Sequence, residues 1–162
     1  AIKINPNYAL AYYDRGVVLD ASPKAPIGKM FIQPDVENAS GERLKLDEAL
    51  GDWFAVVGIN TDPAEHLDAE SLAYWKSLGA TLARVNRSRA GEHLNTVGED
   101  TALLDDVAGG FRDWARGRKD REILVIRPDR YLAASCAADA ANTMTKRFSQ
   151  VLPVKTTIAT GN

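Results

Sequence analysis

Cysteine is almost absent from this sequence, and that scarcity limits the chemistry open to the chain. Among 162 residues there is one cysteine, Cys136, which excludes an internal disulfide and a Cys-x-x-Cys redox pair. Histidine is nearly as rare, and His66 and His93 show neither the cysteine cluster nor the helical spacing of a metal site. We therefore expect a buried, unreactive Cys136, solvated histidines and no bound metal.

The sequence also lacks a charge excess and any long apolar run. Its 20 basic and 22 acidic residues give a formal net charge of -2, which provides no basic field for nucleic acid or an anionic membrane. No apolar stretch approaches the roughly 20 residues that span a bilayer, and no charged-then-apolar leader opens the chain. We expect a soluble, cytoplasmic protein that binds neither nucleic acid nor membranes. The first residue is Ala1, and we interpret the chain as a piece of a longer protein.

Three parts are predicted along the chain. Residues 1–40 carry closely spaced prolines and should form an irregular arm or a linker from a preceding domain, with Gly16–Leu19 as a candidate short strand. Residues 41–155 should form the compact domain, and residues 156–162 a flexible tail. A helical turn is expected over Lys45–Leu50.

The compact part begins with a predicted βαβ unit. Trp53–Ile59 is a near-continuous apolar run, typical of a strand buried on both faces. Asp68 suits the N-cap of a helix that ends at Gly79 and turns Trp75 inward. Thr81–Val85 is the next strand, and the crossover should be right-handed.

The second half predicts a loop, a helix, a β-hairpin and a last helix. The helix should lie within Leu103–Arg116, and the last helix should run from about Asp139 to Leu152. The hairpin strands are Ile123–Ile126 and Tyr131–Ala134. The order β-α-β-α-β-β-α predicts a thioredoxin-like α/β fold, with a mixed sheet of about four strands and helices on both faces. Core packing is expected for the apolar residues Trp53, Trp75, Val107, Phe111, Trp114, Met144 and Phe148.

The turn of the predicted hairpin is Arg127-Pro128-Asp129-Arg130. Pro128 presets the backbone dihedral of the first central turn position, and Asp129 suits the second.

Three segments carry a resemblance to a known family: Pro26–Pro34, Leu46–Phe54 and Ile123–Ala134. They resemble the C-terminal region of FAD-dependent aromatic hydroxylases, in the 3-(3-hydroxyphenyl)propionate hydroxylase and phenol hydroxylase branch. In that family a glycine-containing turn and a Gln-Pro pair lead into the terminal domain. A Leu-Gly-x-x-Phe segment then enters its first strand, and an Arg-Pro-Asp turn joins the hairpin strands. The resemblance covers roughly residues 20–150.

This resemblance implies a terminal, thioredoxin-like domain of an NAD(P)H-dependent flavin monooxygenase that hydroxylates a phenolic ring. FAD and NAD(P)H would belong to other domains of the parent, since this chain has no Gly-x-Gly-x-x-Gly after a strand. Asn60–Pro63 stands where thioredoxin has its cysteines, so thiol exchange is not expected. The implied role is contact with the catalytic domains of the same chain and with other subunits of a homo-oligomer.

We therefore assign no catalytic, cofactor-binding or metal-binding residue to this chain, and expect no enzyme activity from it alone. The assigned positions are structural: Gly28, Pro34, Gly51, Arg127, Pro128, Asp129 and Tyr131.

Two alternatives stay open. A stand-alone thioredoxin-fold interaction module without redox activity would bind a partner through its sheet edge or its Arg84–Arg89 loop. A one-cysteine peroxidase would need an accessible Cys136 with a lowered pKa near a helix N-terminus.

Overall fold

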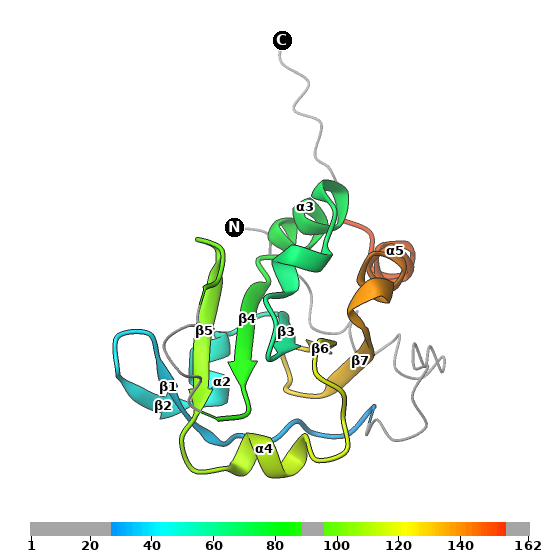
Figure 1. Cartoon of the computed structure of the whole chain (residues 1–162). Helices are drawn as coiled ribbons and strands as arrows, with labels where there is room; N and C mark the ends of the chain where they lie inside the picture. Colours follow the sequence, from blue (N-terminus) through cyan, green and yellow to red (C-terminus); the bar gives the residue numbers. More distant parts are fainter. Residues whose placement is uncertain (1–26, 89–95, 155–162) are drawn as a thin grey trace.

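The computed structural model describes residues 27–88 and 96–154, which fold around one mixed β-sheet (Figure 1). Its strands are arranged in the order β2-β1-β5-β4-β3-β6-β7. They are β1 (Asp35–Asn38), β2 (Arg43–Lys45), β3 (Ala55–Ile59), β4 (Thr81–Asn86), β5 (Thr101–Asp106), β6 (Glu122–Ile126) and β7 (Leu132–Ala137). The helices are α2 (Leu46–Leu50), α3 (Ala69–Ser77), α4 (Gly110–Trp114) and α5 (Ala141–Val151), with short 3-10 helices η1 (Pro63–His66) and η2 (Ala138–Ala140).

The centre of the sheet is β3, whose five residues are all buried. It runs parallel to β4 and antiparallel to β6, so that Ala55 pairs with Thr81 on one side and Ile126 on the other. We call the end of the sheet where β3 and β4 begin the amide end, and the opposite end the carboxyl end. The turn between β6 and β7 lies at the amide end, because it follows Ile126.

Apolar side chains form a core on each face of the sheet. On one face α3 and α5 lie side by side (Figure 1), and Val56 of β3 packs there with Trp75. On the opposite face Val57 packs with Phe111 of α4, the side chains of α2 and residues 27–32. This two-sided burial explains why β3 is apolar at nearly every position.

The predicted mixed α/β sheet with helices on both faces forms, and the unit β3-α3-β4, the β6-β7 hairpin and α5 lie where the sequence placed them. Asp68 caps α3, since its carboxylate accepts a hydrogen bond from the backbone N–H of Ser71 at 2.7 Å. That hydrogen bond lowers the pKa of Asp68. Gly79 follows α3 with a φ of 68°, a dihedral that glycine adopts without strain.

The helix expected within Leu103–Arg116 forms as α4 but covers only Gly110–Trp114, and the sequence missed the strand β5 at Thr101–Asp106. β5 fits between β4 and β1 and is hydrogen-bonded to both, so this strand depends on partners that are distant in the sequence. Phe111 is buried and Trp114 partly buried, as expected, whereas Val107 is only half-buried and precedes the helix.

The sheet also has more strands than the predicted four. β1 lies within the segment 1–40 that was expected to be irregular, and β2 joins it in an antiparallel pair at the sheet edge. The prolines misled the prediction, because Pro34, which belongs to the described part of this segment, directly precedes β1 and does not interrupt it. Gly16–Leu19 and residues 156–162 lie outside the described residues, and the boundary between arm and domain stays a prediction.

The core position predicted for Trp53 is also wrong. β3 begins at Ala55, and the Trp53 side chain is 41% exposed. Within residues 27–88 and 96–154, no helix has both the length and the apolar character needed to cross a bilayer.

Candidate functional site

The predicted hairpin turn is present at Arg127–Arg130. The N–H of Arg130 donates to the carbonyl of Arg127 at 2.9 Å, with Pro128 and Asp129 at the central positions. Arg130 has a φ of 68°, and the N–H of Arg127 donates to the carbonyl of Tyr131 at 2.9 Å. A left-handed residue directly after a turn is how a three-residue hairpin loop fits the twist of its strands.

The side chain of Arg127 closes over this turn. Its guanidinium donates through Nε to Asp129 Oδ1 at 3.0 Å and through Nη2 to Oδ2, an arrangement with two parallel hydrogen bonds. The guanidinium carbon lies 5.5 Å from the centre of the Tyr131 ring. Arg127 is buried while Asp129 is exposed, so the pair locks the turn and presents only its acidic partner to solvent.

Arg130 ties the turn to the end of α2. Its Nη2 donates to the carbonyl oxygens of Asp47, at 3.1 Å, and of Gly51. The carbonyls at a helix C-terminus lack helical partners, and a guanidinium satisfies them. Gly51 follows α2 with a φ of 73°, a dihedral that glycine adopts without strain.

Residues 27–34, which we call the leading segment, run along the start of β7. The N–H of Gly28 donates to the carbonyl of Leu132 at 2.9 Å, and the N–H of Leu132 donates to Lys29 at 3.0 Å. Met30 forms an isolated antiparallel bridge with Tyr131. The leading segment is therefore held at the amide end by the hairpin itself.

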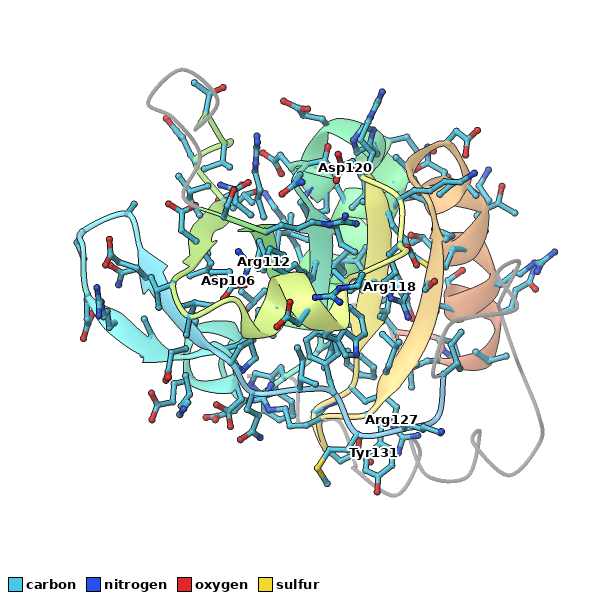
Figure 2. All side chains as sticks on the ribbon, turned by 60° about the horizontal axis from the view of Figure 1, so that its bottom comes forward. Asp106, Arg112, Arg118, Asp120, Arg127 and Tyr131 are labelled. Atoms are coloured by element: carbon cyan, nitrogen blue, oxygen red, sulfur yellow. The ribbon has the colours of Figure 1, made fainter. Side chains whose placement is uncertain are left out.

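We call Gly28–Phe31, Gly51 and Arg127–Leu132 together the hairpin junction. Figure 2 shows Arg127 and Tyr131 at one end of the hairpin strands, with Asp120 toward the other end. The junction contains six of the seven residues predicted from sequence: Gly28, Gly51, Arg127, Pro128, Asp129 and Tyr131. Pro34 lies apart, where its carbonyl accepts from the N–H of Leu46 at 3.0 Å just before β1.

Sequence reasoning missed the part that Arg130 plays in the junction. Its neighbours in the sequence identify a turn, but nothing local predicts a side chain that reaches residues 47 and 51. The positive φ of Arg130 also could not be predicted from its residue type, since glycine or asparagine usually occupies such a position.

Replacing Pro128 with alanine is expected to lower the free energy of unfolding by about 0.5 to 1 kcal/mol, because the unfolded chain gains conformational freedom. Urea denaturation followed by circular dichroism measures the change. An unchanged midpoint would contradict the role assigned to Pro128 in the turn.

The loop after β3, where thioredoxin carries its cysteines, is a polar structural corner in this chain. Asn60, with a φ of 55°, donates through Nδ2 to Asp120 at 2.8 Å and accepts from the N–H of Arg87 at 2.9 Å. The Arg87 guanidinium donates to the carbonyl of Arg118 at 2.6 Å. These contacts join the ends of β3 and β4 to the residues that precede β6.

The carboxylate of Asp62 in this loop caps the N-terminus of the 3-10 helix η1. Asp62 is only 2% exposed and accepts from the N–H groups of Ala64, at 2.9 Å, and Gly98, at 2.7 Å, and from the Thr101 hydroxyl at 2.8 Å. These donors occupy both carboxylate oxygens of Asp62, so the side chain holds the loop in place. Within the described ranges, no group of three or more His, Cys, Asp and Glu side chains is placed to hold a metal ion.

A buried ion pair lies near the carboxyl end of the sheet, where β6 begins. Arg118 Nη1 donates to Glu122 Oε1 at 2.5 Å, with the two side chains 8% and 11% exposed. Ser135 donates to the same oxygen at 2.6 Å, and the Arg118 guanidinium carbon lies 4.3 Å from the centre of the Trp114 ring. The pair joins the segment after α4 to both hairpin strands.

Cys136 is a buried residue of β7 and is 8% exposed. Burial raises the pKa of its thiol to about 12, with smaller contributions from the negative charges of Glu122 and Asp139. A peroxidase nucleophile needs the opposite, a lowered pKa and an accessible sulfur, so this environment argues against the peroxidase alternative.

Cys136 is therefore expected to react slowly with a bulky thiol reagent at neutral pH. The same chain unfolded in denaturant serves as the control and should be labelled fast, because its thiol is then solvated. Equal rates in the two states, measured by intact mass, would revive the peroxidase hypothesis.

Comparison with known proteins identifies a family and relatives for this chain. The HcaD C-terminal domain family matches residues 28–151. A 3-(3-hydroxy-phenyl)propionate/3-hydroxycinnamic acid hydroxylase of Burkholderia cenocepacia (strain HI2424) is 38% identical over 139 residues, which are 84% of this chain and 25% of that protein. The enzyme of the same name from Comamonas testosteroni is 30% identical, over 83% of this chain and 23% of its own length. The chain thus spans about a quarter of these relatives.

Solved structures with low sequence identity share the fold. A thioredoxin-like protein from Bacteroides caccae matches 90% of this chain and 57% of its own, with a TM-score of 0.60 and 14% identity. The flavin-dependent monooxygenase PieE, solved with FAD and substrate, matches 83% of this chain and 23% of its own, with a TM-score of 0.54 and 15% identity. Since the family match covers most of the sequence, the chain belongs to the HcaD C-terminal domain family.

Proposed function

We propose that this chain is the C-terminal, non-catalytic domain of an FAD- and NAD(P)H-dependent hydroxylase of phenolic rings. The observation that carries the proposal is the uneven coverage, in which a hydroxylase from Burkholderia cenocepacia matches 84% of this chain but only 25% of itself. The remaining three quarters of such a protein would hold the flavin and the aromatic substrate. In that parent, FAD would supply the chemistry that adds one oxygen atom of O₂ to the ring, with NAD(P)H as the electron donor.

The environment of the described side chains supports a structural role for this domain. The loop after β3 carries Asn60 and Asp62, both held in hydrogen bonds, at the position of the thioredoxin cysteines. Cys136 is buried with a raised pKa. Polar groups of the hairpin junction bind one another, as Arg127 does when it donates a hydrogen bond to Asp129. We assign the domain to bracing the catalytic domains and to subunit contacts in a cytoplasmic homo-oligomer.

The substrate class proposed for the parent is a phenylpropanoid acid with a hydroxyl group at position 3 of the ring. Relatives that carry this substrate in their names are up to 38% identical to the chain over this domain. A stand-alone interaction module remains the alternative.

The test is the intact mass of the native polypeptide together with its absorbance at about 450 nm, where oxidised flavin absorbs. A yellow protein much heavier than 17.6 kDa is expected. It should oxidise NAD(P)H when given 3-(3-hydroxyphenyl)propionate, and 3-phenylpropionate, which lacks the ring hydroxyl, is the matched control. A colourless native chain of 17.6 kDa would overturn the proposal and favour the stand-alone module.

A further inference from the structure

We propose that the amide end of the sheet is the surface on which the catalytic part of the same polypeptide docks. The proposal rests on the proposed function, because it takes that catalytic part as the partner. We call this surface the amide-end face and define it by Met30, Trp53 and Asp129.

The amide-end face carries the exposed apolar side chains of the described structure. Within the described residues, the large hydrophobic side chains that are exposed are Met30, at 64%, and Trp53, at 41%. Strand register places both at the same end: Met30 bridges to Tyr131 beside the hairpin turn, and Trp53 precedes β3, whose Ala55 pairs with Ile126. Tryptophan and methionine are enriched in protein interfaces, and tryptophan often contributes much of the binding energy.

The backbone beneath these side chains is fixed. Phe31, next to Met30, donates its N–H to the carbonyl of Arg130 at 2.6 Å and buries its ring in the core. The side chain of Arg130 then reaches Gly51, two residues before Trp53. Arg130 therefore links the two exposed residues through one guanidinium and one carbonyl. A partner would meet side chains held on a rigid frame, so docking would cost little conformational entropy.

The position of the leading segment favours the catalytic part of the same chain as the occupant. The segment meets the sheet at the amide end, where Gly28 is bonded to Leu132. About three quarters of such a relative lies outside the part that this chain matches. The matching family is a C-terminal domain, so that larger part would precede this domain in the polypeptide. A covalently attached partner has a high effective concentration, so a small apolar surface is enough to hold it. Asp129 on this face is paired with Arg127, which lowers the cost of removing its carboxylate from water when a partner docks.

The experiment is photo-cross-linking in the full-length native polypeptide, with p-benzoylphenylalanine placed at Met30 or Trp53. Thr143, an exposed residue on α5 toward the carboxyl end, is the matched control position. Isotopically heavy and light chains are mixed before irradiation, and the cross-linked peptides are identified by mass spectrometry. Absorbance of bound flavin is recorded on the same samples.

Cross-links from positions 30 and 53 into the hydroxylase part of the same chain, absent from position 143, are expected. The double variant Met30→Lys and Trp53→Lys should lose protection of residues 27–34 and 51–54 from hydrogen exchange, while Thr143→Lys keeps it. Heavy-to-light cross-links would show a second copy on this face and overturn the proposal, as would yields no higher than at position 143. A polypeptide without flavin would overturn the proposed function alone, because the cross-linked partner is identified separately.

Discussion

Replacing Trp75 with alanine is expected to lower the free energy of unfolding by about 3 to 5 kcal/mol, the range for deleting a buried aromatic side chain. Trp75 is 0% exposed and lies at the centre of the core between the sheet, α3 and α5. Its ring centre is 5.1 Å from that of Tyr74 and 5.3 Å from that of Phe148. Its Nε1 donates to the hydroxyl of Thr145 at 2.9 Å, which also links α3 to α5. Urea denaturation followed by far-ultraviolet circular dichroism measures the loss.

The chain offers a matched control in its other tryptophans. Trp53→Ala removes the same side chain from an exposed position and should cost about 1 kcal/mol or less. Trp75→Phe separates packing from hydrogen bonding, because Thr145 still donates to the carbonyl of Ala141 when the indole N–H is gone. Equal losses for Trp75→Ala and Trp53→Ala would contradict the burial of Trp75.

Removing the Glu122 carboxylate should destabilise the chain by a similar amount. Glu122→Ala leaves the guanidinium of Arg118 buried without its counter-ion, and breaking a buried pair in this way typically costs about 3 to 5 kcal/mol. The Ser135 hydroxyl loses its acceptor in the same step. Thermal unfolding of the single variant, compared with the parent chain, measures the effect.

The control for Glu122 is removal of both charges together. The double variant Arg118→Met and Glu122→Leu replaces the ion pair with apolar side chains of similar length, and we expect it to regain most of the lost stability. A double variant as unstable as Glu122→Ala would show that packing around Arg118, including its contact with Trp114, matters more than the charge.

Elements with a strong local pattern could be predicted from the sequence. The apolar run at Ala55–Ile59, the cap at Asp68 and the Pro-Asp turn at residues 128–129 each carry their own signal, and all three form as expected. β5 could not be predicted because its buried and partly buried positions do not alternate regularly, so it lacks the two-residue period of a typical strand. β1 and β2 are short strands whose stability comes from their pairing partners.

The candidate site divides in the same way. The turn at Pro128 and Asp129 can be predicted because the backbone preferences of these residue types favour a turn. The contact between Arg130 and Gly51 joins residues that are distant in sequence, and Trp53 is exposed only because β3 begins two residues later. No single-sequence pattern encodes such long-range contacts.

The central position of β3 also affects how the domain folds during synthesis. β4 follows β3 closely in the sequence and can pair with it early. The other edge of β3 stays unpaired until β6 has been synthesised, when Gly58 can pair with Ile123. Until the hairpin leaves the ribosome, the apolar strand β3 has an open edge, the kind of edge that pairs with other chains and aggregates. The domain is therefore protected from such pairing only once β6 and β7 have joined the sheet and closed this edge.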